Sequence, residues 1–146
     1  MAKKTYNEKL EYSGDLPKVE KTDKGSIVIV PAVEYDALMK KVPKGKIITI
    51  DRMMGHFAAK YKASRACPMT AGIFVNISAH ASEERLGKKA TPWWRTLKKD
   101  GQLNEKFPDG IEGQKTRLEA EGHTIIQKGK RFLVENYEKK LYNPVL

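Results

Sequence analysis

The chain has a single cysteine among its 146 residues, so it cannot form an internal disulfide. We therefore expect an intracellular protein, because disulfides are rare in reducing compartments. Long apolar runs are also absent: the longest, residues 27–33, is far shorter than the roughly 20 residues that a membrane-spanning helix needs. Residues 1–4 are followed by polar residues rather than by the apolar region of a signal peptide. These absences predict that no membrane is a partner.

Residue patterns for metals, cofactors and hydrolytic sites are missing as well. Three histidines, His56, His80 and His123, and Cys67 show none of the pairwise spacings that zinc sites use. The chain contains neither G-x-G-x-x-G nor G-x-x-x-x-G-K-[ST], the two common nucleotide-binding loops. It also offers no acid pair and no Ser-His-Asp grouping. We therefore expect no metal and no cofactor.

One enzymatic option remains, and it rests on Cys67. This cysteine precedes Pro68 at the start of a predicted helix and follows Arg65 by two residues. Both the helix dipole and the guanidinium would favour the thiolate. The alternative is a thiol that is buried in ordinary packing, which is common for cysteine.

The size of the chain suits one domain with a hydrophobic core. Hydrophobic residues make up 40% and charged residues 32% of the sequence, which is typical of a globular protein rather than a disordered one. We expect residues 1–24 to form an N-terminal extension and residues 25–146 to form the domain. We also expect a monomer.

Positive charge is concentrated in one part of the chain. The net charge is +10, and residues 40–99 hold fourteen Lys and Arg against three Asp and Glu. All of the excess therefore lies in this segment, which predicts an anionic partner, with nucleic acid as the first choice. The alternatives are a solvated basic surface and a protein-interaction module for an acidic partner. Salt-dependent binding to random DNA would separate these hypotheses.

Apolar spacing and turn residues predict the first half of the fold. Residues 26–30 are a β-branched run that predicts a buried strand, and residues 32–41 a helix that Pro43 ends. A helix that Asp51 begins carries Met53, Met54, Phe57, Ala58 and Tyr61 on one side. Pro68 begins the next helix, which should run to Leu86 and stop at Gly87. Its core-facing residues are predicted to be Ile73, Phe74, Ile77 and Ala81. These two helices predict a helix-turn-helix, with the second as the recognition helix.

The second half predicts a wing. Residues 111–121 should be helical and stop at Gly122, while residues 124–126 and 131–134 flank Lys128-Gly129-Lys130 as a hairpin. Residues 96–101 indicate a short strand and turn, and residues 6–12 and 135–146 short helices. We predict an α+β fold: a mainly helical winged helix-turn-helix domain with a small antiparallel sheet. That sheet should join residues 27–30 to the C-terminal hairpin, with no parallel sheet.

The two tryptophans of the chain are adjacent, in Thr91-Pro92-Trp93-Trp94-Arg95. Neighbours in an extended segment point to opposite sides, so one indole can face the core while the other faces a cleft. This arrangement suits base stacking. It suits core packing equally, because tryptophan is usually well buried.

Four further motifs are Val42-Pro43-Lys44-Gly45-Lys46-Ile47-Ile48-Thr49, Pro92-Trp93-Trp94-Arg95, Phe107-Pro108-Asp109-Gly110 and Leu118-Glu119-Ala120-Glu121-Gly122. In order and spacing, residues 35 to 122 with these motifs resemble the DNA-binding domain of the alkylguanine-DNA alkyltransferases. Trp93 stands where this family has its alkyl-accepting cysteine, and Trp94 where it has the activating histidine. Tryptophan at the cysteine position marks the alkyltransferase-like branch, which binds damaged bases without repairing them. That branch keeps the histidine, and this chain does not.

The resemblance implies a non-enzymatic protein that binds double-stranded DNA, accommodates a flipped, alkylated guanine and has a repair protein as partner. It places the base pocket at Trp93, Trp94, Arg95, Phe107 and Glu121. The resemblance, together with the basic or polar character of the side chains, places DNA contacts at Lys44, Lys46, Thr49, Arg65, Thr70, Asn76, Lys98 and Lys99. Arg65 is the candidate for the family's arginine finger, the alternative being a phosphate contact or a solvated side chain. Ile50 replaces a tyrosine that touches DNA in the family. In a prokaryote we would expect a cytoplasmic, nucleoid-associated protein, and the alternative function is a general winged-helix DNA binder.

Overall fold

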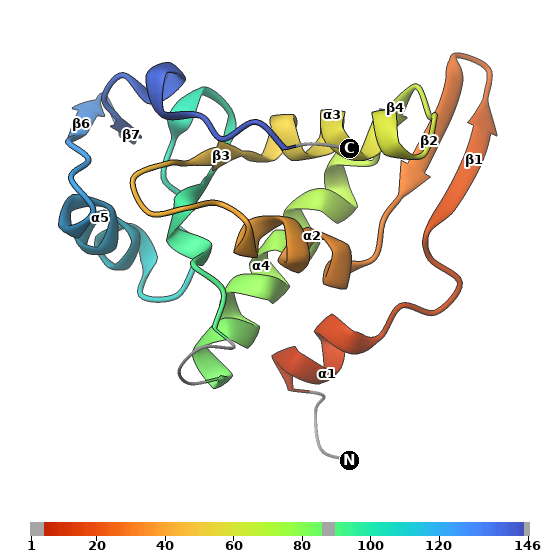
Figure 1. Ribbon diagram of the computed structural model, residues 1–146, viewed down its shortest axis with the longest axis horizontal. Helices are drawn as coiled ribbons and strands as arrows, with labels where there is room; N and C mark the ends of the chain where they lie inside the picture. The colour runs from red at the N-terminus through yellow and green to blue at the C-terminus, as the bar shows by residue number, and fades with distance from the viewer. Residues whose placement is uncertain (1–4, 86–89, 145–146) are drawn as a thin grey trace.

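Three helices form the centre of the protein (Figure 1). In the computed structural model, which describes residues 5–85 and 90–144, they are α2 (Ala32–Lys40), α3 (Ile50–Lys60) and α4 (Pro68–Glu84). Met53 and Phe57 lie four residues apart on α3, so both face the same side and are buried. Pro68 suits the first turn of α4, where its missing N–H is not needed. The main core lies between these helices and includes Tyr35, Met39, Phe57, Val75 and Trp93.

Short strands connect the helices and extend from both ends of the molecule. They are β1 (Lys18–Thr22), β2 (Gly25–Ile29), β3 (Ile48–Thr49), β4 (Arg65–Ala66), β5 (Thr96–Leu97), β6 (Ile125–Lys128) and β7 (Arg131–Val134). The antiparallel β1–β2 hairpin lies at one end, and the antiparallel β6–β7 hairpin lies at the other (Figure 1). β4 pairs in parallel with β2, and β5 pairs in parallel with β3, over two residues each.

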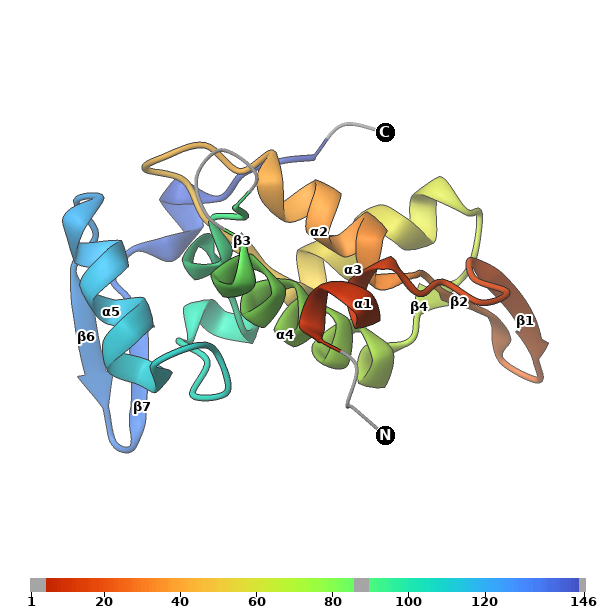
Figure 2. The same ribbon diagram turned by 90° about the horizontal axis from the view of Figure 1, so that it is seen from below.

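Helix α5 (Gly110–Ala120) lies beside the β6–β7 hairpin (Figure 2). A second core cluster forms here from Ile47, Leu97, Leu103, Leu118 and Val134. Three 3₁₀ turns complete this part: η2 (Trp93–Arg95), η3 (Lys99–Gly101) and η4 (Tyr137–Lys140). The turn at η3 needs a glycine, because Gly101 has a φ of +80° and a Cβ there would lie 2.7 Å from the Tyr137 ring.

The N-terminal helix α1 (Tyr6–Glu11) packs on α4 (Figure 2). Thr5 and Glu8 form a capping box that begins the helix. The Tyr6 ring stacks on His80 with the ring centroids 4.8 Å apart, and Leu10 is buried. Residues 5–11 therefore pack on α4, the helix that the sequence predicts as the recognition helix. The division of the chain at residue 24 stays a prediction.

The predicted fold class is confirmed: the chain is mainly helical, with the α3–α4 pair and the β6–β7 wing where the sequence places them. The predicted sheet is wrong, because β2 and the C-terminal hairpin belong to separate sheets. The helical layer lies between them (Figure 1). The expected absence of parallel pairing is also wrong. Helices connect β2 to β4 and β3 to β5, and such crossovers allow parallel strands to meet.

The predicted buried face of α4 needs correction. Ile73 is 50% exposed, and the buried face of α4 is formed by Ala71, Val75, Ser78, Ala79, Ala81 and Ser82. Val33 of α2 is also exposed, whereas Asp36 is buried. The reason is polar pairing: Ser78 donates a hydrogen bond to Asp36 at 2.6 Å, which turns these polar residues inward. The predicted helix end at Leu86 and Gly87 lies outside the described residues.

Within residues 5–85 and 90–144, no helix is both long enough and apolar enough to span a lipid bilayer.

Candidate nucleic-acid interface

Trp93 is completely buried at the centre of the aromatic site. It lies in the η2 turn and not in an extended segment, so the two indoles do not point to opposite sides. The Trp93 and Trp94 rings instead meet edge to face, with centroids 5.8 Å apart. Phe107 contacts Trp93 in the same way at 5.5 Å, and it is only 2% exposed. The described conformation therefore holds Trp93 as a core residue.

Arg117, which the sequence did not single out, covers the Trp93 ring. Its guanidinium carbon lies 4.8 Å from the centre of the indole, within cation–π range. The guanidinium also donates to the Gly113 carbonyl at 2.9 Å, and it forms ion pairs with Glu83 at 3.2 Å and Asp109 at 3.8 Å. Residues from α4, α5 and the loop before α5 thus meet over one aromatic ring.

Arg95 and Glu121, both predicted pocket residues, form an ion pair. The guanidinium donates to both carboxylate oxygens, at 2.9 Å from Nε and 2.6 Å from Nη2, and a third N–H group donates to the Val42 carbonyl at 2.7 Å. Burial acts to raise the pKa of Glu121, but the hydrogen bonds and charge of Arg95 outweigh it, so the pKa is below its usual range. The pair joins the η2 turn to the end of α5.

Trp94 is half-buried beside this pair. The Arg95 guanidinium lies 5.5 Å from the centre of its ring. The indole N–H helps to lower the pKa of Glu121, yet it has no partner at hydrogen-bond geometry. The Trp93 indole N–H is likewise buried without a partner. Two buried donors therefore remain unpaired in one small region, which is uncommon in proteins.

Gln114 fixes the backbone around the aromatic site, although no local signal in the sequence marks it. The side chain is completely buried, and its amide nitrogen donates to the carbonyls of Trp94 at 3.0 Å and Thr96 at 2.9 Å. Its amide oxygen accepts from the Asn104 N–H at 2.7 Å. Helix α5 therefore positions both the tryptophan turn and the loop that leads to Phe107.

A buried carboxylate network holds the segment before Trp93. Asp36 accepts hydrogen bonds from Ser78 and from Thr91, each at 2.6 Å, and Lys40 and Arg85 form ion pairs with it. Burial acts to raise the pKa of Asp36, but these hydrogen bonds and the charge of Lys40 keep the pKa below its usual range. The network therefore connects α2, α4 and the tryptophan segment.

The exposed face of α4 points away from α2. Ser78 contacts Asp36 of α2, and residues half a turn away from Ser78 lie on the opposite side of α4. Met69 and Ile73 are 72% and 50% exposed on that side, which is unusual for large apolar residues. Asn76 is half-buried on the same side, and its side-chain oxygen has no partner. This face of α4 therefore carries two exposed apolar side chains and an amide oxygen without a partner.

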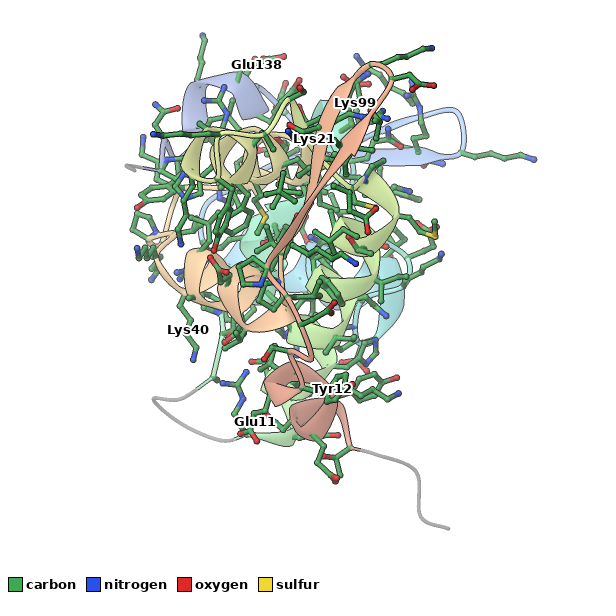
Figure 3. All side chains as sticks on the ribbon, turned by 90° about the vertical axis from the view of Figure 1, so that its right-hand side faces the viewer. Glu11, Tyr12, Lys21, Lys40, Lys99 and Glu138 are labelled. Carbon is green, nitrogen blue, oxygen red and sulfur yellow. The ribbon has the colours of Figure 1, made fainter. Side chains whose placement is uncertain are left out.

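The predicted lysine contacts come from two segments of the chain. Lys44 and Lys46 are exposed on the loop between α2 and β3, while Lys98 and Lys99 follow β5. Figure 3 shows Lys40, at the end of α2, and Lys99 on different sides of the molecule. Thr49 is only 3% exposed, so its side chain could reach DNA only if its neighbours moved.

The turn before α4 holds three more residues that the sequence singled out. Arg65 is exposed in β4, and Thr70 is half-buried and donates to the Cys67 carbonyl at 3.3 Å. Burial acts to raise the pKa of the Cys67 thiol, but hydrogen bonds from Thr70 and Met69 and the charge of Arg65 lower it below its usual value. Cys67 lies at the N-terminal end of α4, whereas Thr91 bonds to Ser82 near the other end. That separation is about 22 Å along the helix.

No family model and no curated protein sequence matches the chain. Its fold is that of the alkyltransferase-like proteins, as two solved structures show. The first is a crystal structure of the S. pombe alkyltransferase-like protein in complex with DNA, with a TM-score of 0.54 and 20% identity. The second is S. pombe Atl1 in complex with damaged DNA containing O6-carboxymethylguanine, with a TM-score of 0.53 and 21% identity. Each match covers 77% of this chain and 94% of the other.

Proposed function

We propose that this chain is a non-enzymatic DNA-binding protein of the alkyltransferase-like type, which accommodates a flipped, alkylated guanine beside Trp93 without removing the alkyl group. The observation that carries the proposal is the fold it shares with proteins that were crystallised on plain and damaged DNA. Such a protein would act in repair, by marking a lesion for a repair partner. It would work as a monomer, and in a prokaryote on the nucleoid.

We expect no alkyl transfer because of the position of Cys67. An alkyl group moves only to a nucleophile within reach, and the residue that corresponds to the family's acceptor is Trp93, whose indole is not a thiolate. Cys67 lies at the far end of α4 from the tryptophan segment. The family's general base is absent too, because Trp94 cannot take up a proton as a histidine does.

DNA would approach the face of α4 that carries Met69 and Ile73. This face is free of α2, and minor-groove proteins commonly insert apolar side chains between base steps. The β6–β7 hairpin has Lys128, Lys130 and Arg131 at its tip, where a wing contacts phosphates. The base pocket would comprise Trp93, Trp94 and Phe107, with Arg95 and Glu121 as its support.

Affinity for plain duplex should fall steeply with salt. With about four phosphate contacts, raising the salt from about 50 to about 200 mM lowers the affinity about a hundredfold, because counterions are released on binding. Fluorescence anisotropy with a labelled duplex measures the slope. Lys98→Ala with Lys99→Ala should reduce the slope by about one per lysine that contacts a phosphate.

The matched variant for this test is Lys44→Ala with Lys46→Ala, which removes the same charge from the loop that follows α2. We expect the slope to fall here too, by about one per lysine that contacts a phosphate. A larger effect from this pair would move the bound surface to the α2 side. No binding at low salt would favour the protein-interaction module instead.

Incubation with a duplex that contains O6-methylguanine should leave the methyl group on the DNA. The reason is that the aromatic site has no nucleophile, as described above. Mass spectrometry of the intact protein provides the measurement, and Cys67→Ser is the control. A gain of one methyl group that Cys67→Ser abolishes would reinstate the enzymatic hypothesis.

A further inference from the structure

The Trp93 indole is not accessible in the free protein. Of the side chains that cover it, Arg117 is the one that can move away without breaking core contacts. The indole is 0% exposed, so a base can reach it only if a neighbour moves. Phe107 is itself 2% exposed and packed in the core, so moving it would break apolar contacts. Arg117 is different, because its side chain is 32% exposed and its ion-pair partners lie at the surface.

The Arg117 guanidinium lies over the face of the Trp93 indole, with its central carbon 4.8 Å from the ring centre. Guanidinium groups and bases can both occupy an aromatic face, so Arg117 covers the surface that a stacking base would need.

Surface carboxylates hold Arg117 in place. Glu83 on α4 is 43% exposed, and Asp109 before α5 is 72% exposed. Exposed ion pairs are weak and are screened by salt. Glu83 and Asp109 reach the guanidinium through Nη2 alone, whereas a DNA phosphate can accept two hydrogen bonds from it in the fork geometry of arginine.

We propose that Arg117 is a gate over Trp93, which Glu83 and Asp109 hold closed and which a DNA phosphate opens. The proposal rests on the proposed function and adds a specificity-determining residue to it. Approach of the duplex transfers the guanidinium from the two carboxylates to the backbone, and this uncovers the indole for the flipped base. DNA binding and pocket opening are thereby coupled through one side chain.

The first test uses the free protein and needs no DNA. Trp94→Phe leaves Trp93 as the sole tryptophan, and acrylamide quenching of its emission reports access to the ring. In that background, Glu83→Gln should raise the quenching constant about two- to fivefold, the range that loss of one exposed ion pair produces. Arg117→Lys should raise it as well, because lysine keeps the charge but cannot stack as a plane. Glu112→Gln is the matched control, since it removes the same charge from an exposed α5 residue that is not an ion-pair partner of Arg117.

The second test compares alkylated with plain duplex in the chain that retains Trp94. Glu83→Gln should raise the affinity for alkylated duplex up to about fivefold relative to Glu112→Gln, because less of the protein is closed. The Glu112→Gln variant cancels the general gain in DNA affinity that follows from removing a negative charge. Quenching in Glu83→Gln and Arg117→Lys that equals the parent value would overturn the gate. A wild type without lesion preference would instead overturn the proposed function, while the quenching result would still decide the gate.

Discussion

Trp93→Ala should lower the free energy of unfolding by about 3 to 5 kcal/mol, the range for truncating a fully buried large aromatic residue. The ring is 0% exposed and packs against Trp94, Phe107 and Arg117, so the variant leaves a cavity beside the buried aromatic rings. Urea unfolding followed by circular dichroism measures the change. Trp94→Ala is the matched control, and it should have a smaller effect because Trp94 is only half-buried.

Trp93→Phe separates packing from base recognition. It retains most of the apolar contacts, so the variant should fold, but it offers a smaller face and no N–H. Wild-type protein should bind alkylated duplex about five- to a hundredfold more tightly than plain duplex, since stacking is worth about 1 to 3 kcal/mol per base. Trp93→Phe should reduce this preference and leave the salt-dependent affinity for plain duplex unchanged. Equal wild-type affinity for both duplexes would leave a general winged-helix DNA binder.

Local signals in the sequence were sufficient for the helices. Met53 and Phe57 repeat at helical spacing, and Pro68 marks the start of α4, so both helices could be predicted without knowing their distant contacts. Strand β1 gave no such signal, because all five of its residues are exposed and only pairing with β2 holds them extended. Predicted bounds were therefore good where periodicity was strong, and poor where a partner strand decides the conformation.

The candidate site was predicted less well, for a different physical reason. Charge was counted along the chain, but the count cannot tell that Lys40 and Lys99 lie on different sides of the molecule (Figure 3). Arg117 was missed because its importance depends on Trp93, which only the folded chain brings to it. The two interpretations of Trp93 were both left open by the sequence, and the folded chain favours packing in the absence of DNA.

The hydrogen-bond network at Asp36 is the largest feature that the sequence did not reveal. Disrupting it is the second change for which we expect a large loss of stability. Ser78 and Thr91 are 42 and 55 positions away from Asp36 in the sequence, so no spacing rule could have found them. Removing either the carboxylate or its hydrogen-bond donors leaves the other group buried without a partner, which costs stability. The burial of Asp36 could not be predicted for this reason, because its partners are distant in the sequence.

Asp36→Ala should therefore lower the free energy of unfolding by about 3 to 5 kcal/mol, because two hydrogen bonds to a charged acceptor are lost and Ser78 and Thr91 remain buried. Asp36→Asn keeps the shape and should lower it less. The network also predicts the effect of acid. The folded pKa of Asp36 lies below its usual value of 3.8, so its contribution is complete above that pH and is lost as the pH falls through the folded pKa.

Unfolding curves measured between pH 7 and about pH 3 should thus show wild-type stability falling at the acid end, with a smaller fall in Asp36→Asn. Glu121 also contributes to the loss of wild-type stability at low pH, because Arg95 lowers the pKa of Glu121 too. The variant retains Glu121, so the difference between the two curves isolates Asp36. Identical acid dependence in both proteins would mean that Asp36 is not ionised in the network, and that its hydrogen bonds to Ser78 and Thr91 hold the tryptophan segment without its charge.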